Sequence, residues 1–544
     1  MASQHGRRRC SSPLSTGEVD LIDAEVKELD EEIHRLIERR RLLWQRRNTL
    51  VTINRLPEEL LVEILDLSGK SWLSTTPLMK LLWVCQWWRK IALESSRLWT
   101  WIGQMNSTEL SRWLSLSKHS SLHINFVNSR SFSAKFTQEL FAALQRTQTL
   151  RLGFLHINLE IKFYWTQPPH RLEVLGLENV ELSTRALAKA PLLHLFMGQC
   201  KFRWESRVSG CSHLVSFHLI HPVDQVPLTT FLNLVKGMPR LNTLVLVEAL
   251  QESSSEQPSP ISIPILGLSI LKIHSKNIEL HLQFLELSSC ITQQTDALLD
   301  FELSTRDRAQ IHLALSRLDS LCCTPARKVT QLDLWDSTSV DIRYSCVVHN
   351  ATDQEKPVRL IIKGHFVNAS ASSIRTATIL SANLFLEHLH TLTISAPDSE
   401  ARRDDNYHAK LVRLFGTLPH LEQVDLHSRS AMWQLLRAST AICDPDAPMP
   451  FPALKRIGQF QNRDKWDDFP KLLLSFLDNR VKHERDISTL IFKKAAVGWD
   501  EEMMEELRRI TGTIVYRVDS ETRWDDPGLK SLSLQNWRTD LYCI

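Results

Sequence analysis

Glycine is scarce and scattered in this chain of 544 residues. None of the 16 glycines lies within a few residues of another, so there is no GxGxxG or GxSxG loop to cradle a phosphate or hold a strained nucleophile. The fragment GKS at Gly69 lacks the glycine that a phosphate loop needs five residues earlier, where Ile64 stands. These absences remove most nucleotide-binding and hydrolase functions.

Paired cysteines, long apolar runs and a charge excess are missing as well. The ten cysteines include no CxxC pair, which argues against a zinc ribbon or a disulfide framework, and the neighbours Cys322 and Cys323 are expected to be reduced. No stretch reaches the roughly 18 apolar residues of a membrane-spanning helix, and the N-terminus has no apolar signal region. A formal net charge of +3 is too small to indicate nucleic-acid or membrane binding. We expect a cytoplasmic or nuclear protein.

Candidate metal ligands are equally weak. His119 and His123 have HxxxH spacing, but a serine follows His119 where a zinc protease carries its acid. Asp404, Asp405 and His408 lie in a charged segment without the glycine turn of a calcium loop. We therefore predict no catalytic residue, no metal site and no cofactor, and a protein that is not an enzyme.

A continuous amphipathic helix is predicted over residues 21–50, after a disordered stretch at 1–20. The segment contains no Gly or Pro, and its leucines recur every seven residues at Leu29, Leu36, Leu43 and Leu50, with Ile22, Val26 and Ile33 beside them. Arg40 and Arg47 occupy the other seam position in the second half, which weakens self-pairing. A coiled-coil dimer and a helix docked on its own protein both fit this pattern.

Residues 51–105 are rich in tryptophan and predict a small helical module. Its first helix starts at Pro57, with Glu58 and Glu59 favourable at the positive end of the helix dipole. One apolar stripe is predicted on that helix from Leu60, Leu61, Ile64 and Leu65. The segment SGKSWLSTTP then breaks the helix, and a second one is predicted over 78–93, before a connecting helical segment at 106–146. Three short helices bury little surface alone, so we expect a partner.

Beyond residue 147 the chain changes to short, leucine-rich segments. LLHLFMGQCKF and LQFLELSSC fit the template LxxLxLxxCxL, and looser copies begin near residues 147, 172, 214, 241 and 268. The first starts are roughly 20 to 27 residues apart, within the 20 to 29 typical of leucine-rich repeats. Later copies at 329, 389, 421 and 454 are isolated. We predict an irregular leucine-rich-repeat α/β solenoid over 147–520, followed by a tail at 521–544.

In such a solenoid, alternate residues of each strand point into the core and the others line a concave face. The candidate residues on that face are Glu173, Val174, His194, Glu286 and Thr393. A last strand, helix and strand are predicted between residues 487 and 518, with a charged outer helix face as a terminal unit requires. The fold class is thus α followed by α/β.

The module at 51–105 resembles the F-box. The fragments INRLPEELLVEIL and LMKLLWVCQWWRKIALESSRLWTWI carry the resemblance to this three-helix module, which docks a substrate receptor onto the Skp-type adaptor of a cullin-RING ubiquitin ligase. The order of charged helix, F-box and leucine-rich region is similar to F-box-like proteins of mushroom-forming fungi. The resemblance implies adaptor contacts at Leu56, Pro57, Leu60, Leu61, Ile64, Leu65, Val84, Cys85, Trp88, Leu98 and Trp99.

The resemblance also implies a function. It predicts a substrate-recognition subunit of an SCF-type ubiquitin ligase, linked to a cullin through the adaptor and to an unknown protein target through the leucine-rich region. The alternative is a non-catalytic leucine-rich scaffold in which the F-box serves only as a packing module. The sequence does not identify the target, and no target-binding residue follows from it beyond strand position.

Overall fold

The computed structural model has a mixed α/β fold with one large, mostly parallel sheet. The chain divides into two compact units: unit 1 contains Met1–Asn125 and Ser133–Arg146, and unit 2 contains Phe126–Phe132 and Thr147–Ile544. The main division falls at residue 147, where the leucine-rich region was predicted to begin. The structure describes residues 16–69, 79–80, 82–129, 134–154, 162–163, 169–182, 190–202, 211–252, 267–292, 294–303, 308–325, 327–335, 339–346, 357–364, 373–395, 407–426, 432–433, 435–437, 449–460, 469–492 and 501–516.

Unit 1 is mainly helical. Its elements are α1 (Thr16–Leu50), η1 (Thr52–Arg55), α2 (Glu58–Gly69), α4 (Gln86–Glu94), η2 (Ser96–Trp99), β1 (Trp101–Ile102), α5 (Ser107–Leu116), the first part of β2 (Leu122–Ser129), α6 (Ala134–Ala143) and η3 (Leu144–Arg146). The connecting helical segment predicted over 106–146 contains the helices α5 and α6, but β2 lies between them. Its residues pair in parallel with β1, Trp101 beside His123.

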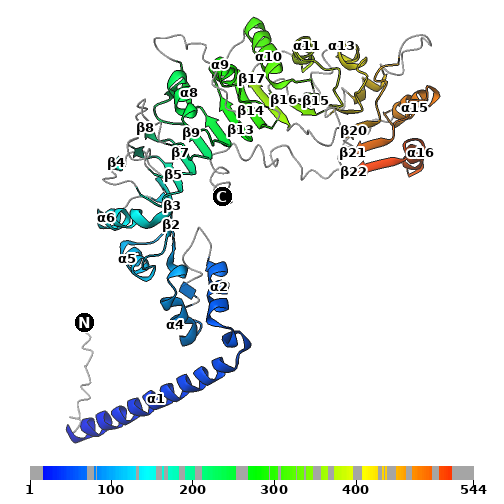
Figure 1. Ribbon diagram of the computed structural model, residues 1–544. Helices are drawn as coiled ribbons and strands as arrows, with labels where there is room; N and C mark the ends of the chain where they lie inside the picture. Colours follow the sequence, from blue (N-terminus) through cyan, green and yellow to red (C-terminus); the bar gives the residue numbers. More distant parts are fainter. Residues whose placement is uncertain are drawn as a thin grey trace, which may run out of the picture. The chain divides into compact units, whose positions relative to one another are not determined.

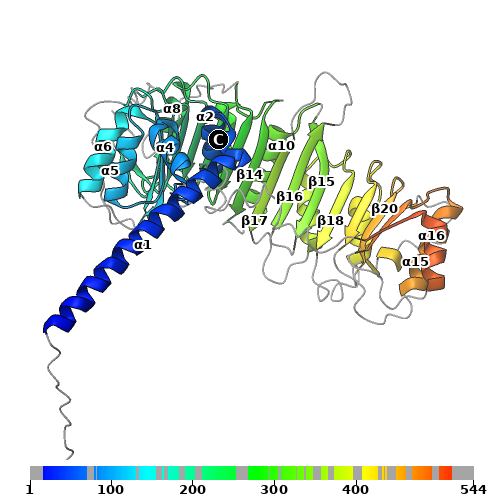
Figure 2. The same cartoon turned by 90° about the horizontal axis from the view of Figure 1, so that it is seen from below.

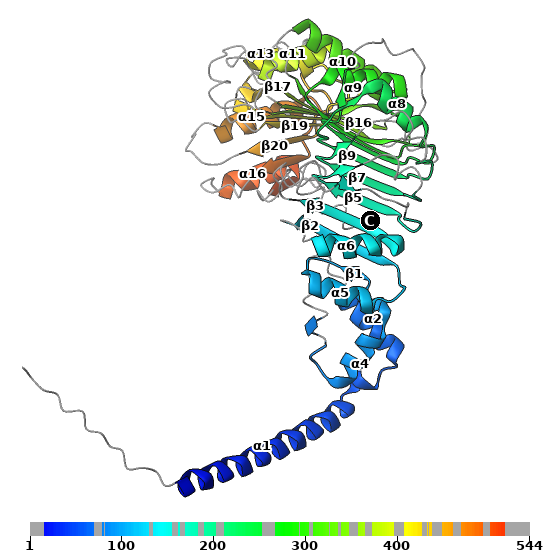
Figure 3. The ribbon, with the colours of Figure 1, turned by 90° about the vertical axis from the view of Figure 1, so that its left-hand side faces the viewer.

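The first long helix is longer than predicted. α1 begins at Thr16, so residues 16–20 are helical although the sequence predicts disorder there. Glu18 in the first turn suits the positive end of the helix dipole, and Arg47 in the last turn suits the negative end. Figure 3 shows α1 as one uninterrupted helix.

The second helix of the tryptophan-rich module is shorter than predicted. A turn at residues 82–84 interrupts the expected helix over 78–93, and α4 starts only at Gln86. Cys85 has the extended backbone of an N-cap (φ −159°, ψ 170°), and its Sγ accepts a hydrogen bond from the backbone N–H of Trp88 at 3.5 Å. This cap fixes the start of α4.

Unit 2 contains a row of strands that begins at β3 (Thr147–Phe154). It continues through β5 (Val174–Glu178), β7 (His194–Gly198), β9 (Ser216–Ile220), β11 (Thr243–Val247), β13 (Ile270–Ser275) and β14 (Asp296–Leu303), each parallel to its neighbour. The register partners follow at intervals of 20 to 27 residues, at Thr149, Val174, His194, Ser216, Thr243, Ile270 and Asp296. The predicted copies near 147, 172, 214, 241 and 268 all lie at the starts of strands.

The second half of the sheet departs from a simple series. After β14 the spatial order is β17 (Val358–Gly364), β16 (Ser339–Cys346), β15 (Arg327–Trp335), β18 (Thr391–Ser395), β19 (Gln423–Leu426), β20 (Arg456–Phe460), β21 (Thr489–Phe492) and β22 (Thr513–Tyr516). Figure 2 shows β14, β17, β16, β15 and β18 in that order. β16 is antiparallel to both neighbours, so β16 and β17 are inserted between β14 and β15.

Two small sheets flank the large one. β4 (Lys162–Phe163), β6 (Glu181–Leu182) and β8 (Lys201–Phe202) pair in parallel, as do β10 (Val226–Pro227) and β12 (Leu250–Gln251). These short strands directly follow β3, β5, β7, β9 and β11 along the chain, so the chain repeats the same arrangement in this half of the row.

Helices cover one side of the sheet. They are α8 (Leu228–Lys236), α9 (Ile278–Ser288), α10 (Arg308–Cys322), α11 (Ser373–Asn383), α13 (Tyr407–Phe415), α15 (Phe469–Lys482) and α16 (Glu501–Thr511). Figure 1 shows that the sheet curves and that α8 to α13 lie on its outer side. The opposite side is called the concave face below.

The core of unit 2 lies between the sheet and these helices. The ring of Phe217 on β9 stacks 6.3 Å from Phe231 of α8, which meets Phe284 of α9 edge-on at 5.6 Å. The alternate strand residues that share this side are fully buried, among them Leu175, Leu244, Leu271, Leu332 and Leu392. Burial of these leucines explains why the alternating pattern predicts the strands.

The end of the described sheet agrees with the sequence. β21, α16 and β22 form the strand, helix and strand predicted between 487 and 518. On α16, Met504 and Leu507 are buried, whereas Glu501, Glu502 and Arg508 are exposed. Residues 1–15 and the predicted tail at 521–544 lie outside the described residues.

Candidate functional site

The first candidate site is the tryptophan-rich module, residues 51–105. On its helix α2, Leu61 and Leu65 are buried at 0% and 1% exposure, whereas Leu60, Ile64 and Leu67 are 48%, 41% and 69% exposed. The exposed residues follow one another at helical spacing and share one face. The prediction of a single stripe from Leu60 to Leu65 is therefore wrong, because one half packs inward and the other faces solvent.

The turn before α4 exposes a second apolar group. Trp83, Val84 and Trp87 are 77%, 53% and 40% exposed, a large apolar surface for so small a module. Arg89 donates from Nε to the carbonyl oxygen of Leu82 at 3.0 Å and so holds this turn against α4. Exposed tryptophan is typical of protein-binding hot spots.

Two tryptophans form the interior of the module. Trp88 donates from Nε1 to Asn54 Oδ1 at 2.6 Å, which joins α4 to η1. Trp99 donates from Nε1 to the carbonyl oxygen of Ala92 at 2.6 Å and meets Trp113 edge-on with ring centroids 4.9 Å apart. Both indole N–H groups are therefore satisfied inside unit 1.

An ion pair with one buried partner lies beside the same interior. Arg97 of η2 reaches Asp66 of α2, with Nη2 2.9 Å and Nε 3.0 Å from Oδ2. The Asp66 side chain is buried, while the Arg97 side chain is largely exposed. The pair joins α2 to η2 on the side of α2 that packs inward.

The eleven predicted adaptor contacts divide into two sets. Five are core side chains in this structure and cannot touch a partner directly: Leu61, Leu65, Trp88, Leu98 and Trp99. Six reach the surface: Pro57, Leu60, Ile64 and Val84 are exposed, and Leu56 and Cys85 are half-buried. The sequence prediction missed Leu67 and Trp83, although Leu67 continues the helical spacing of Leu60 and Ile64.

The second candidate site is the concave face of unit 2. Residues in register point to the same side of a sheet and therefore form rows across the strands. The basic row, so named from its charged members, contains Arg151, Gly176, Phe196, His218, Val245, Lys272, Leu298, Arg359, Arg343, Gln331, Thr391, Gln423 and Arg456. The acidic row lies two residues further along each parallel strand, and two residues earlier on the antiparallel β16. It contains Glu178, Gly198, Ile220, Val247, His274, Asp300, Ile361, Asp341, Asp333, Thr393, Asp425 and Gly458.

The first half of the concave face is apolar. Phe196, Ile220, Val245 and Val247 form a buried cluster over β7, β9 and β11. His218 adjoins it, with its ring centroid 6.1 Å from that of Phe196 and its Nε2 2.8 Å from Ser216 Oγ. Burial, reinforced by Lys272, lowers the pKa of His218 to about 3, so its ring is neutral at pH 7.

The second half of the concave face is charged and hydrogen-bonded. Arg359 binds the buried Asp341, with Nη2 2.7 Å from Oδ2 and Nε 3.1 Å from each carboxylate oxygen. Gln331 donates from Nε2 to both oxygens of Asp333, at 3.2 and 3.0 Å. Residues of the basic row thus neutralise or hydrogen-bond carboxylates of the acidic row.

The same arrangement recurs on β19. Gln423 donates from Nε2 to Asp425 Oδ2 at 2.7 Å, as Gln331 does to Asp333 on β15. The two strands share the pattern Gln, apolar residue, Asp, Leu. Beside Asp425 stands Gly458, where an added Cβ would overlap the carboxylate. A larger residue there would require the carboxylate of Asp425 to move.

Two of these aspartates face each other. Asp333 of β15 lies directly opposite Asp341 of β16 in the antiparallel register. Burial raises the pKa of Asp333, and the charge of Asp341 raises it further, whereas hydrogen bonds from Thr393 and Gln331 lower it. The folded state therefore disfavours the charged form of Asp333.

Four of the five predicted concave-face residues belong to this region. Val174 and His194 begin β5 and β7 in one register pair, and Thr393 lies in the acidic row. Glu173 immediately precedes β5 and accepts a hydrogen bond from Gln148 Nε2 at 2.8 Å. Burial lowers the pKa of His194, and Arg151 lowers it further.

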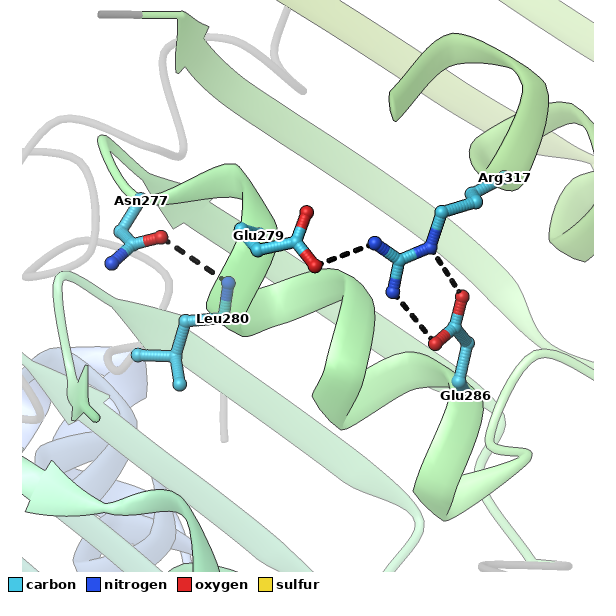
Figure 4. A network of polar contacts seen from close by, with 5 residues as sticks. All are labelled: Asn277, Glu279, Leu280, Glu286 and Arg317. Atoms are coloured by element: carbon cyan, nitrogen blue, oxygen red, sulfur yellow. Dashed lines mark hydrogen bonds and ion pairs between the residues drawn. The ribbon is translucent and has the colours of Figure 1, made fainter. Parts of the chain in front are cut away.

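Glu286 is misplaced by the prediction. The segment LQFLELSSC forms most of α9 and not a strand, so Glu286 lies on the helical side of unit 2. Figure 4 shows that Arg317 of α10 binds Glu286 through two contacts of 2.7 Å and Glu279 through one of 2.6 Å. Asn277 caps α9 by accepting from the N–H of Leu280 at 3.2 Å. Leu282 and Leu285, three residues apart, also fit the spacing of a helix.

The structure places several of the weak metal and thiol candidates. His119 is exposed, and the ring of His123 stacks on Trp101 at 4.1 Å; Asp404 and Asp405 lie outside the described residues. Cys322 and Cys323 are free thiols. Within the described ranges, no three His, Cys, Asp or Glu side chains are placed to hold a metal ion, and no helix is long and apolar enough to cross a membrane.

Comparison with known proteins adds no family to this description. No protein-family model matches the chain, and no curated protein matches it.

Proposed function

We propose that this protein is a non-catalytic substrate receptor. In this proposal the tryptophan-rich module docks on the Skp-type adaptor of a cullin-RING ubiquitin ligase, the concave face of unit 2 binds the target protein, and other subunits transfer ubiquitin. The observation that carries the proposal is the exposed apolar face of α2, next to an interior that is already complete without it.

The burial pattern supports docking rather than packing for that face. Leu61 and Leu65 fill the interior of the module, so Leu60, Ile64 and Leu67 are not needed for it. Removing a Leu or Ile side chain fully from water contributes about 1.5–3 kcal/mol of favourable free energy. An exposed residue gains this free energy only when a partner covers it. Trp83 and Trp87 extend the exposed apolar surface. Tryptophan is among the residues that contribute most of the binding energy in protein interfaces.

The concave face supports a protein ligand through its polar side chains. In the basic row, Lys272, Gln331, Arg343 and Gln423 are half-buried and Arg456 is exposed, whereas the apolar cluster around Val247 is buried. Polar side chains of this kind supply the direct hydrogen bonds of protein interfaces.

A leucine-rich scaffold without a ligase is the second candidate. The observation that favours it is the burial of Trp88 and Trp99, which serve the interior of unit 1. In this case the F-box-like module would stabilise unit 1, and the exposed face of α2 would have no adaptor.

The test measures binding of the full chain to a Skp-type adaptor by calorimetry. The variant Leu60→Asp with Ile64→Asp changes the exposed face only. Its matched control is Leu313→Asp with Phe385→Asp, whose parent side chains are 57% and 52% exposed in unit 2. Deleting residues 51–105 would be a poorer test, because it also removes Trp99 from the Trp113 contact.

We expect the α2 variant to bind at least a hundredfold more weakly, since two buried contacts of about 1.5 kcal/mol each are lost and two charges are introduced. The control should bind as the unchanged chain does, and both variants should unfold at the parent temperature. Equal binding by the α2 variant, or no binding by the parent at micromolar concentration, would favour the scaffold.

A further inference from the structure

The helix α1 carries an exposed apolar stripe along its whole length. The stripe residues are 42% to 65% exposed: Val19, Ile22, Val26, Leu29, Ile33, Leu36, Leu43 and Leu50. A helix of 35 residues is about 52 Å long, so the stripe is a large surface to leave in water. Within unit 1, the stripe faces solvent and does not dock along the other helices of that unit.

The stripe has the period of a coiled coil. Val19, Val26 and Ile33 are seven residues apart and occupy the first apolar position, a, of each heptad. The second position, d, contains Ile22, Leu29, Leu36, Leu43 and Leu50. In the second half of the helix, position a contains Arg40 and Arg47 instead. A partner for this stripe must therefore supply apolar residues at one end and accommodate two arginines at the other.

Charge on α1 is divided between its two halves. Residues 16–33 contain eight Asp and Glu and one Lys, whereas residues 34–50 contain six Arg and one Glu. The acidic half of one α1 is complementary to the basic half of another α1 that runs in the opposite direction. A second copy of the chain therefore has the charge pattern that the stripe requires.

The direction follows from the positions beside the stripe. In a parallel pair, Glu25 would lie beside Asp30 of the second copy, which places acid against acid. In an antiparallel pair, Ile33 of one copy can lie opposite Leu36 of the other. In that register, Glu25 faces Arg46 of the second copy and Glu32 faces Arg39. Each of these two contacts occurs twice by symmetry.

The same register also explains the two arginines in the stripe. Arg40 would oppose Leu29 of the second copy, and Arg47 would oppose Ile22. Asp30 and Asp23 directly follow these two apolar residues in the sequence and flank the seam. The aliphatic part of each arginine can then pack against the opposing Leu29 or Ile22, with its guanidinium beside the carboxylate of Asp30 or Asp23.

We propose that α1 binds α1 of a second copy of this chain as an antiparallel coiled coil, in the register that opposes Ile33 to Leu36. The proposal does not depend on the function proposed above. It makes the protein a dimer whose two remaining bodies are attached to opposite ends of one coiled coil.

The test exchanges charges in the full-length chain. One variant carries Glu25→Arg and Glu32→Arg, and the other carries Arg39→Glu and Arg46→Glu. Each variant turns four attractive contacts of the antiparallel pair into four repulsive ones, so each should dimerise about a hundredfold more weakly than the parent. Mixing the two variants restores all four contacts and should restore the parent dimer. Sedimentation equilibrium measures the dissociation constants.

The same variants exclude the other arrangements. A parallel dimer would be strengthened by Glu25→Arg, which would then face Asp30, and would not respond to mixing. A parent chain that is monomeric at micromolar concentration overturns the proposal, as does a mixture that remains as weak as its components. The four substitutions lie on an exposed helix, so thermal unfolding of the remainder of the chain should be unchanged and serves as the folding control.

Discussion

Removing Arg359 tests whether the charged half of the concave face is held by its buried ion pair. Arg359→Met keeps most of the aliphatic stem and deletes the guanidinium that binds both oxygens of Asp341. Asp341 would then remain buried, directly opposite the carboxylate of Asp333. Both the lost attraction and the surviving repulsion between these carboxylates lower the stability of unit 2.

The magnitude follows from burial. Breaking one side of a buried ion pair costs 3–5 kcal/mol, and the Arg359 side chain is 16% exposed, so we take the lower end, about 3 kcal/mol. For a unit of about 400 residues this is a fall of roughly 4 °C in the unfolding temperature. The assay is thermal unfolding followed by circular dichroism at pH 7.

A matched control separates burial from the presence of an ion pair. Lys455 and Glu422 form a pair with the same 2.7 Å separation, but their side chains are 59% and 44% exposed. Lys455→Met should therefore cost less than about 1 kcal/mol. If the two variants unfold together, burial does not set the strength of the Arg359 pair. The double variant of Arg359→Met with Asp341→Asn should recover part of the loss, because it removes the uncompensated charge.

Two further predictions concern buried charges of unit 2. The folded state raises the pKa of Asp333, so the free energy of unfolding falls as pH rises from the ordinary aspartate pKa of 3.8 through the folded pKa. Asp333→Asn should therefore be more stable than the parent in urea unfolding at pH 7. Below pH 3.8 this advantage should disappear. Arg480→Met should lower the free energy of unfolding by about 3 kcal/mol. The reason is that the buried guanidinium donates to the carbonyl oxygens of Arg485, Pro450 and Phe451 at 2.9, 3.2 and 3.0 Å. Lys482→Met, at an exposed position, is the control in the same assay.

The sequence predicted most of the row of strands because one face of each strand is buried. An alternating segment such as LNTLVLV has its leucines in the core, so the pattern follows from solvent exclusion alone. The same pattern wrongly predicted a strand at 282–290, because LQFLELSSC fits the spacing of a helix as well as that of a repeat. The template alone does not distinguish a strand from an amphipathic helix of similar composition.

The division of the tryptophan-rich module between core and surface could not be predicted in the same way. Leu60 and Leu61 are identical neighbours in the sequence, and the packing of α2 against η2 and α4 buries Leu61 and leaves Leu60 exposed. Trp88 is likewise placed in the interior by Asn54, 34 residues earlier in the chain. Contacts between distant segments determine exposure, and a local pattern does not contain them.

The inserted strands β16 and β17, which the sequence pattern did not predict, change the concave face. A simple repeat would place β15 beside β14, and then neither Asp341 nor Arg359 would lie between them. The irregular segment therefore creates the ion pair on the concave face and sets Asp341 opposite Asp333. It also separates the apolar cluster around Val245 from the hydrogen-bonded row around Asp425. The apolar cluster is buried, so a target that binds this face meets polar side chains that reach the surface, such as the half-buried Arg343 and Gln423, and the insertion supplies the first of these.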